Sequence, residues 1–125
     1  MTPDRFTAKR QRSEKQGRSS EMLAALLLRL KGYRILGRRV RTRLGEIDLV
    51  ARSPKGVLCF VEVKARADAR SAALSLGGRQ QARIARAAGL FVAGKPALAR
   101  APVRFDVVTV SPRAWPRHFP DAWRP

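Results

Sequence analysis

The sequence has little cysteine, histidine or aromatic content: one Cys, one His and 6% aromatic residues. A single cysteine excludes an internal disulfide and a cysteine-rich zinc site, and apolar neighbours indicate that Cys59 is a buried core thiol. No apolar run is long enough to span a membrane, and residues 1–20 lack the apolar segment of a secretion signal. These absences predict a cytoplasmic protein without a membrane partner.

Acidic residues are also scarce, which leaves the chain strongly basic. Lys and Arg number 27 against 9 Asp and Glu, a formal net charge of +18. The basic residues run through the whole chain and do not cluster beside an apolar anchor, which argues against a membrane surface as the anionic partner. A phosphate backbone attracts such a chain through counterion release. The charge therefore predicts a nucleic-acid-binding protein.

The length and pattern of the chain predict one domain between two less regular ends. Residues 1–18 are polar and basic without periodicity, which predicts a flexible basic arm or simply a disordered terminus. The domain covers residues 19–110. Four prolines predict no regular structure in the tail, residues 111–125. The tail aromatics can stack on bases or on a partner, or cover a sheet edge: Trp115, Phe119 and Trp123.

Periodicity predicts an α/β fold with a mixed β-sheet flanked by helices, in the order α-β-β-β-α-β. The first helix begins at Ser19 or Ser20 and ends at Gly32. Its apolar stripe is spaced i, i+3, i+4, i+7: Leu23, Leu26, Leu27 and Leu30. Strands are expected over residues 33–43, 45–51, 57–66 and 103–110, and a second helix over residues 71–93.

Residues 53–56, Ser-Pro-Lys-Gly, suit a tight turn, so the second and third strands should form a hairpin. Because alternate residues of a strand share a face, Glu46 and Asp48 can converge with Glu62 and Lys64. Facing carboxylates repel, and a divalent cation relieves this, so Asp48 and Glu62 are candidate Mg²⁺ or Mn²⁺ ligands. Lys64 can orient the attacking water or neutralise a phosphate. The spacing fits phosphodiester hydrolysis, but a solvated, mutually paired surface can carry the same residues.

The segments GEIDLV and FVEVKAR resemble the YraN family, bacterial proteins with a restriction-endonuclease-like core akin to archaeal Holliday-junction resolvases. The resemblance covers residues 17–110 and includes KGYRIL, RTRLGEIDLVA and RFDVV. It implies the PD-(D/E)XK nuclease motif, with an acid on the first helix at Glu21 and the others at Asp48, Glu62 and Lys64. It also implies branched DNA as substrate.

Three positions depart from the family pattern. Gly77 and Gln80 stand where a Thr and a Lys are usual near the start of the second helix, and Arg39 stands where Asn is usual. A Gln can hydrogen-bond a phosphate or a water but supplies no charge. Arg79 or Arg83 could substitute in stabilising the transition state.

Phosphate contacts are expected from arginines on the first strand, at the end of the third strand and on the second helix. Alternation places Arg39, Arg41 and Arg43 on one face, which favours a basic track. The predicted nucleic-acid-binding residues are Arg38, Arg39, Arg41, Arg43, Arg66, Arg79 and Arg83.

Four other ionisable residues have simpler interpretations. Glu21 would be favoured in the first turn of a helix by the macrodipole alone. Glu46 is an outer metal ligand or a partner of an Arg, and Asp106 is a structural acid that pairs with a basic residue. His118 lacks a second ligand in a recognisable motif, which predicts a surface residue.

The leading hypothesis is a Mg²⁺-dependent endonuclease that acts on branched or structured DNA. One alternative is a non-catalytic DNA-binding module whose acids form structural ion pairs, and another is an RNA-binding protein, since a basic surface reads phosphate and not sugar. Junction cutting requires two sites related by two-fold symmetry, which is compatible with a homodimer.

Overall fold

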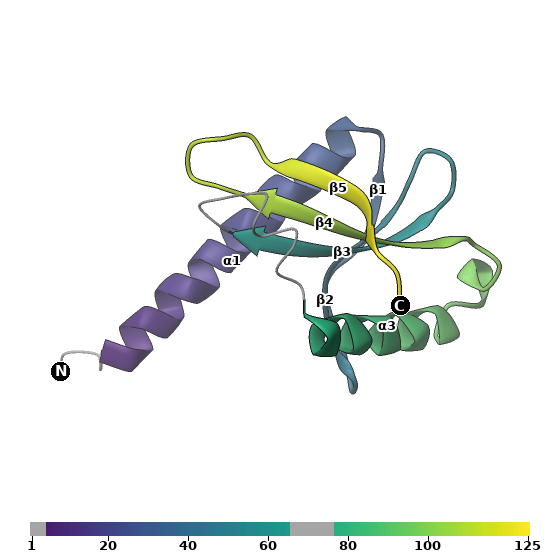
Figure 1. Ribbon diagram of the computed structural model, residues 1–125, viewed down its shortest axis with the longest axis horizontal. Helices are drawn as coiled ribbons and strands as arrows, with labels where there is room; N and C mark the ends of the chain where they lie inside the picture. The colour runs from purple at the N-terminus through teal and green to yellow at the C-terminus, as the bar shows by residue number, and fades with distance from the viewer. Residues whose placement is uncertain (1–4, 66–76) are drawn as a thin grey trace.

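The computed structural model describes residues 5–65 and 77–125, and the side chains of residues 18–65 and 77–125. The elements along the chain are α1 (Arg5–Leu30), β1 (Arg34–Thr42), β2 (Gly45–Arg52), β3 (Leu58–Ala65), α3 (Gly78–Ala93), the 3₁₀ helix η1 (Pro96–Leu98), β4 (Val103–Val110) and β5 (Arg117–Trp123). The strands form one mixed sheet in chain order, in which only β3 and β4 are parallel (Figure 1). The predicted α/β class is confirmed. The structure adds one strand, β5, after the last strand that the sequence predicted.

The hydrophobic core is divided between the two faces of the sheet, with one helix on each. On the α3 face, Phe60 stacks on Phe105 with ring centroids 5.8 Å apart, and Ile84 of α3 packs with them. On the α1 face, Leu28 packs with Cys59, whose predicted burial is confirmed. Successive residues of β3 therefore alternate between the two halves of the core, as a pleated strand requires.

The predicted hairpin between β2 and β3 is confirmed. Its turn is closed by a 2.9 Å hydrogen bond from the Gly56 N–H to the Ser53 carbonyl, with Gly56 at a positive φ of 87°. The two strands pair from Arg52 and Leu58 as far as Leu49 and Val61, and they do not pair beyond that point. The hairpin thus separates near the middle of each strand.

Helix α1 begins at Arg5, so the prediction of a start at Ser19 or Ser20 was wrong. Residues 5–18 are rich in Arg, Lys, Gln and Glu, which have high helix propensity, and no proline interrupts them. Gly17 costs only about 1 kcal/mol within a helix, which the longer helix tolerates. The predicted end is confirmed, because Gly32 follows with a φ of 86°.

The buried stripe of α1 differs from the predicted one. Ala24, Ala25 and Leu28 are 0–1% exposed and pack on the sheet. Of the four predicted leucines, only Leu27 is partly buried, and the other three are 43–72% exposed. Residues 22–30 are apolar on almost every side, so periodicity alone does not choose the face, and the small alanines allow the closer approach to the sheet.

The tail forms an edge strand, so the expectation of no regular structure there was wrong. Strand β5 pairs with β4, with Phe119 opposite Val107 and Trp123 opposite Phe105. Pro120 lies in the irregular stretch between these pairs, where a bulge on an edge strand needs no N–H from it. The interpretation of Phe119 and Trp123 as residues that cover a sheet edge is confirmed.

Helix α3 ends at Ala93, as predicted, but it begins at Gly78, because Gly77 has an extended conformation with a φ of −73° and a ψ of 160°. The prediction of one continuous helix over residues 71–93 was therefore wrong at Gly77. The predicted residues 71–76 of this helix lie outside the described residues. Ile84 and Ala88 are both 4% exposed, which confirms the predicted apolar face. Across residues 5–65 and 77–125, no helix combines the length and apolarity that a membrane crossing requires.

Candidate metal and nucleic-acid site

Asp48 and Glu62 are the first residues of β2 and β3 beyond the last pair of the hairpin, Leu49 with Val61. The backbone N–H of Val63 donates a 2.8 Å hydrogen bond to Asp48 Oδ2. The carboxylate therefore bonds directly to the neighbouring strand where the backbone ladder has ended. This bond fixes Asp48 beside the segment that carries Glu62.

Glu62 projects to the α3 face, as do Leu58 and Phe60 earlier in the strand. Its Oε1 accepts a 3.2 Å hydrogen bond from Gln80 Nε2 in the first turn of α3. Its Oε2 is buried, and no donor in the described part of the chain reaches it. The adjacent Asp48 carboxyl could share a hydrogen bond with Glu62 only if one of the two carried a proton.

Asp48 raises the proton affinity of Glu62, whereas a hydrogen bond from Glu62 lowers the proton affinity of Asp48. Burial raises the pKa of Glu62 to about 8, and the charge of Asp48 contributes in the same direction, while Lys64 and Gln80 oppose the shift. Burial also raises the pKa of Asp48, although the hydrogen bond from Val63 opposes this. A buried pair of this kind favours any positive charge placed between the oxygens, whether a proton or a metal ion.

Glu21 reaches the site from α1, on the other face of the sheet. Arg39 Nε donates a 2.6 Å hydrogen bond to Glu21 Oε2, and this bond raises the pKa of Arg39. The charge of Glu21 in turn contributes to the raised pKa of Asp48. The sequence did not predict the ion pair of Arg39 with Glu21. Because α1 begins at Arg5, Glu21 lies well inside the helix, so its predicted position in the first turn was wrong.

Arg39 has a left-handed backbone conformation, with a φ of 49°. It lies between Arg38 and Val40, whose partners are Leu49 and Ile47, so it stands across from Asp48. This conformation suits Asn better than Arg. The strain is about 1–3 kcal/mol, and the ion pair with Glu21 offsets part of it.

Lys64 follows Glu62 on the α3 face, and its charge acts on the Glu62 carboxyl. Its register partner in β4 is Thr109, which is 1% exposed and whose Oγ1 has no partner within the described residues. Thr109 is a polar group of the site that the sequence did not assign to it. The signal for Thr109 was a single hydroxyl among the valines of RFDVVTV.

No group of three or more His, Cys, Asp or Glu in residues 18–65 and 77–125 is arranged to hold a metal ion. Mg²⁺ does not require such a group, because it keeps several waters and is usually held by one or two carboxylates and a substrate phosphate. Asp48 and Glu62 fit this requirement, and the unsatisfied Glu62 Oε2 is the atom that a cation would bind.

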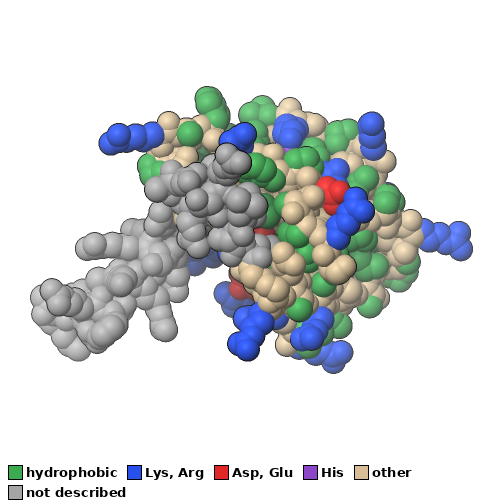
Figure 2. Space-filling model, in the orientation of Figure 1, with side chains coloured by type: hydrophobic (Ala, Val, Ile, Leu, Met, Phe, Trp, Pro, Cys, Tyr) green, Lys and Arg blue, Asp and Glu red, His purple; other side chains and the backbone are tan. Residues whose placement is uncertain are grey.

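Exposed arginines border the site. The β1–β2 turn packs against α3, since a side chain at Gly45 would come 3.5 Å from the Arg83 carbonyl oxygen. Lys and Arg side chains line the lower edge in Figure 2, where Figure 1 places α3 and this turn. Arg41 pairs only loosely with Glu46, at 3.7 Å. Arg66 lies outside the described residues, and the exposed members of the predicted set are Arg38, Arg41, Arg43, Arg79 and Arg83.

A second ionic cluster lies on the α1 face, away from the carboxylate pair. Asp106 is 0% exposed and accepts hydrogen bonds from Arg104 Nε at 2.8 Å and from the Asp121 N–H at 3.0 Å. His118 Nε2 lies 2.7 Å from Asp106 Oδ2, and only 2% of the His118 side chain is exposed. The structural role predicted for Asp106 is confirmed. The surface position predicted for His118 was wrong, because β5 pairs with β4 and the His118 side chain lies against Asp106.

The order of elements and the placement of Asp48 and Glu62 at the separation of β2 and β3 define a restriction-endonuclease-like α/β core. Residues 20–110 match the family described as "Uncharacterised protein family UPF0102". The chain belongs to this family, which is the YraN family that the sequence resembles.

Relatives match over most of their own length. A UPF0102 protein of Parvibaculum lavamentivorans is 53% identical over 109 residues, which cover 87% of this chain and 81% of the relative. A UPF0102 protein of Agrobacterium fabrum is 48% identical over 123 residues, 98% of this chain and 100% of the relative. A UPF0102 protein of Rhizobium etli is 50% identical over 118 residues, 94% of this chain and 95% of the relative.

Proposed function

We propose that the protein is a Mg²⁺- or Mn²⁺-dependent endonuclease that hydrolyses phosphodiester bonds in branched or structured DNA. The observation that carries the proposal is the half-buried pair of Asp48 and Glu62, whose buried Glu62 Oε2 lacks a donor within the described residues. A buried carboxylate oxygen without a partner costs free energy, and the charge of Lys64 offsets only part of the shift that burial and Asp48 impose on Glu62.

Asp48 and Glu62 would hold the metal ion. When bound, the ion supplies a water of lowered pKa and stabilises charge on the scissile phosphate. Lys64, on the same face as Glu62, orients the attacking water or neutralises the phosphate oxygens. Gln80 holds Glu62 Oε1 by a hydrogen bond, and Val63 holds Asp48 Oδ2, so both carboxylates are fixed before a ligand arrives.

The basic rim supports a nucleic acid as the substrate. Arg41 and Arg43 lie at the β1–β2 turn and Arg79 and Arg83 lie on α3, which packs against that turn, so these exposed arginines form one basic border for a phosphate backbone. Each phosphate contact contributes about 0.9 to the slope of log K against log salt for duplex DNA. Replacement of one of these arginines should therefore reduce the slope by about 0.9.

The decisive experiment follows cleavage of labelled linear, forked and four-way DNA in EDTA, Mg²⁺ or Mn²⁺. Wild-type protein should cut in metal only, and Glu62→Gln should reduce the rate by more than about 100-fold because it removes a ligand charge. Glu46→Gln is the matched control, since Glu46 is a neighbouring acid whose side chain is 45% exposed. Equal cutting by wild type and Glu62→Gln would overturn the proposal and indicate a contaminating nuclease.

A non-catalytic DNA-binding module is the second candidate. The ion pair of Arg39 with Glu21 favours it, because one acid of the motif is already neutralised by the protein itself. DNA binding that is unaffected by EDTA and accompanied by no cutting in either metal would establish this function. Competition with structured RNA at fixed salt tests the RNA-binding alternative, because a protein that prefers RNA would release labelled DNA at a lower concentration of RNA than of unlabelled DNA.

A further inference from the structure

The loop between β4 and β5 exposes a tryptophan. Trp115 is 83% exposed, the highest value among the large hydrophobic side chains described. Trp123, by contrast, is 9% exposed and stacks on Phe105 with ring centroids 4.3 Å apart. Packing within the described residues does not explain why the loop carries the Trp115 side chain. Pro112 and Pro116 flank Trp115 and restrict the backbone of the loop. The exposed indole is therefore available to an external ligand.

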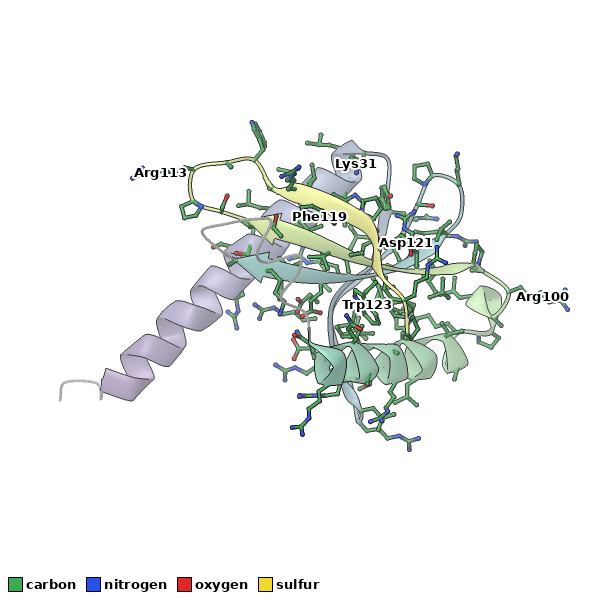
Figure 3. All side chains as sticks on the ribbon, in the orientation of Figure 1. Lys31, Arg100, Arg113, Phe119, Asp121 and Trp123 are labelled. Atoms are coloured by element: carbon green, nitrogen blue, oxygen red, sulfur yellow. The ribbon has the colours of Figure 1, made fainter. Side chains whose placement is uncertain are left out.

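Trp115 lines a pocket between this loop and α1. The pocket has a volume of about 640 Å³, within the roughly 300–1,000 Å³ of small-molecule sites. Leu23 and Val110 contribute apolar walls, and Ser19 contributes a hydroxyl group. The described lining includes no acidic residue, and Arg113 on the loop projects away from the body of the molecule (Figure 3).

The pocket also explains part of the exposed apolar surface of α1. Leu23 is 43% exposed although it belongs to the stripe predicted to be buried. It lines the pocket together with Trp115, so an apolar face of the helix and an aromatic ring lie around one space. A flat, uncharged ring could be placed against such a surface, and base–aromatic stacking contributes about 1–3 kcal/mol per base.

The charge near the pocket favours a nucleotide over other flat ligands. Arg113 lines the pocket beside Trp115, and residues 111–120 contain no acid. An aromatic wall binds the base, a hydroxyl can hydrogen-bond its edge, and Arg113 attracts the attached phosphate. An acidic or neutral loop would carry no such preference.

The pocket lies at the end of the strand that carries the acids. Ala65 lines it and follows Glu62 by three residues of β3, a distance of roughly 10 Å along a strand. Glu62 and Lys64 project to the α3 face, whereas alternation places Ala65 on the α1 face. A phosphate at the acids and a base in the pocket would thus lie on opposite faces of the sheet end. A continuous stacked duplex does not offer that geometry, whereas an unpaired nucleotide does.

We infer that this pocket binds an unpaired nucleobase, and that Trp115 thereby selects DNA with bases outside the stack. The inference rests on the proposed function for the nature of the partner. It requires binding only, so its test can be read whether or not the protein cuts DNA.

The test measures equilibrium binding in EDTA to a continuous duplex and to the same duplex with one unpaired 2-aminopurine. Trp115→Ala should weaken binding to the second DNA by about 5- to 100-fold, the loss of one stacked base. It should leave binding to the continuous duplex unchanged, and Trp115→Phe should retain most of the preference. Wild-type protein should quench the 2-aminopurine fluorescence, and Trp115→Ala should not.

Leu30→Ala is the matched control, because Leu30 is 72% exposed and does not line the pocket. Trp115→Ala must also unfold at the wild-type temperature, as its exposure predicts. An equal loss of affinity for both DNAs, or no loss for either, would overturn the inference. So would a shift from dimer to monomer in Trp115→Ala during sedimentation, because the pocket would then be an interface between copies of the chain.

Discussion

Glu62 Oε1 accepts a 3.2 Å hydrogen bond from Gln80 Nε2, whereas the other carboxylate oxygen of Glu62 has no donor within the described residues. The half-satisfied carboxylate lies next to Asp48, in a region where burial already raises the pKa of both acids. The site therefore costs folding free energy in the absence of a cation, and this cost can be measured without any assay of cleavage.

The first prediction concerns the pH dependence of stability in EDTA. The pKa of Glu62 is about 8 in the folded protein against an ordinary value of 4.5. Between pH 4.5 and 8, Glu62 keeps its proton in the folded protein but has lost it in the unfolded chain. The contribution of protonated Glu62 to the free energy of unfolding is therefore complete below pH 4.5 and is lost as the pH rises to about 8. The free energy of unfolding should fall by on the order of 1–3 kcal/mol between pH 5 and 8.

Urea unfolding of wild type, Glu62→Gln and Glu46→Gln in EDTA checks this prediction. Glu62→Gln should flatten the pH dependence because the amide does not titrate, whereas the exposed Glu46→Gln should retain it. Mg²⁺ should stabilise wild type more at pH 8 than at pH 5, since the proton competes with the metal ion. A pH dependence that is the same in all three proteins would contradict the assignment to Glu62.

The second prediction tests which face of α1 is buried. Leu28→Ala should destabilise the protein by about 2–5 kcal/mol, because it leaves a cavity beneath the helix. Leu26→Ala, at a position that is 49% exposed, should change stability by less than about 0.5 kcal/mol. Thermal unfolding compares the two variants, which carry the same Leu→Ala change at a buried and at an exposed position. Equal destabilisation would show that both stripes of the helix are buried.

The sequence predicted the order of the elements but not every face or end. Residues 103–110 were predicted as a strand with the observed bounds, because alternating valines and flanking breaks define them. Helix α1 is apolar on more than one side, so the choice between its leucine and alanine stripes depends on the sheet it meets. The strand β5 was missed because Pro120 forbids a central strand and not a bulge on an edge strand.

Asp48, Glu62 and Lys64 were predicted from alternation in two short strands, and Glu21 from the resemblance to the YraN family. In the structure Asp48 and Glu62 lie where β2 and β3 separate, with Lys64 two residues after Glu62, and Glu21 binds Arg39, which stands across from Asp48. Such contacts depend on how elements that are far apart in the sequence pack together. For the same reason the sequence could not show the pairing of Arg39 with Glu21.

The third prediction concerns the cluster that holds β5 to the sheet. Burial alone would raise the pKa of Asp106, but hydrogen bonds from His118 and Arg104 and from the Asp121 N–H lower it to about 2. The contribution of the ionised Asp106 carboxylate to stability is therefore complete above its ordinary pKa of 3.8, and it is lost as the pH falls through about 2. Asp106→Asn should destabilise the protein by about 2–4 kcal/mol, because it leaves the partly buried Arg104 without its counter-charge.

Asp121→Asn provides the control for Asp106→Asn. Asp121 pairs with Arg124 on the surface, so the loss of that ion pair should leave the urea midpoint unchanged. Hydrogen exchange adds a local measurement, since β5 amides should lose protection in Asp106→Asn before those of β2 and β3 do. Retained protection in β5 would show that the aromatic contacts of Phe119 and Trp123 suffice to hold the strand.

The last prediction concerns Thr109, whose buried Oγ1 has no partner in the described part of the chain. Thr109→Val keeps the shape of the side chain and removes a hydroxyl that the apo fold does not satisfy, so stability should be unchanged or should rise by up to about 1 kcal/mol. If the hydroxyl positions a water beside Lys64, the same substitution should lower metal-dependent cleavage while the protein remains folded. Thermal unfolding and cleavage rates on one preparation separate the two effects. A loss of stability would instead show that Thr109 already has a bound water or another partner in the folded protein, because only a satisfied hydroxyl contributes to folding.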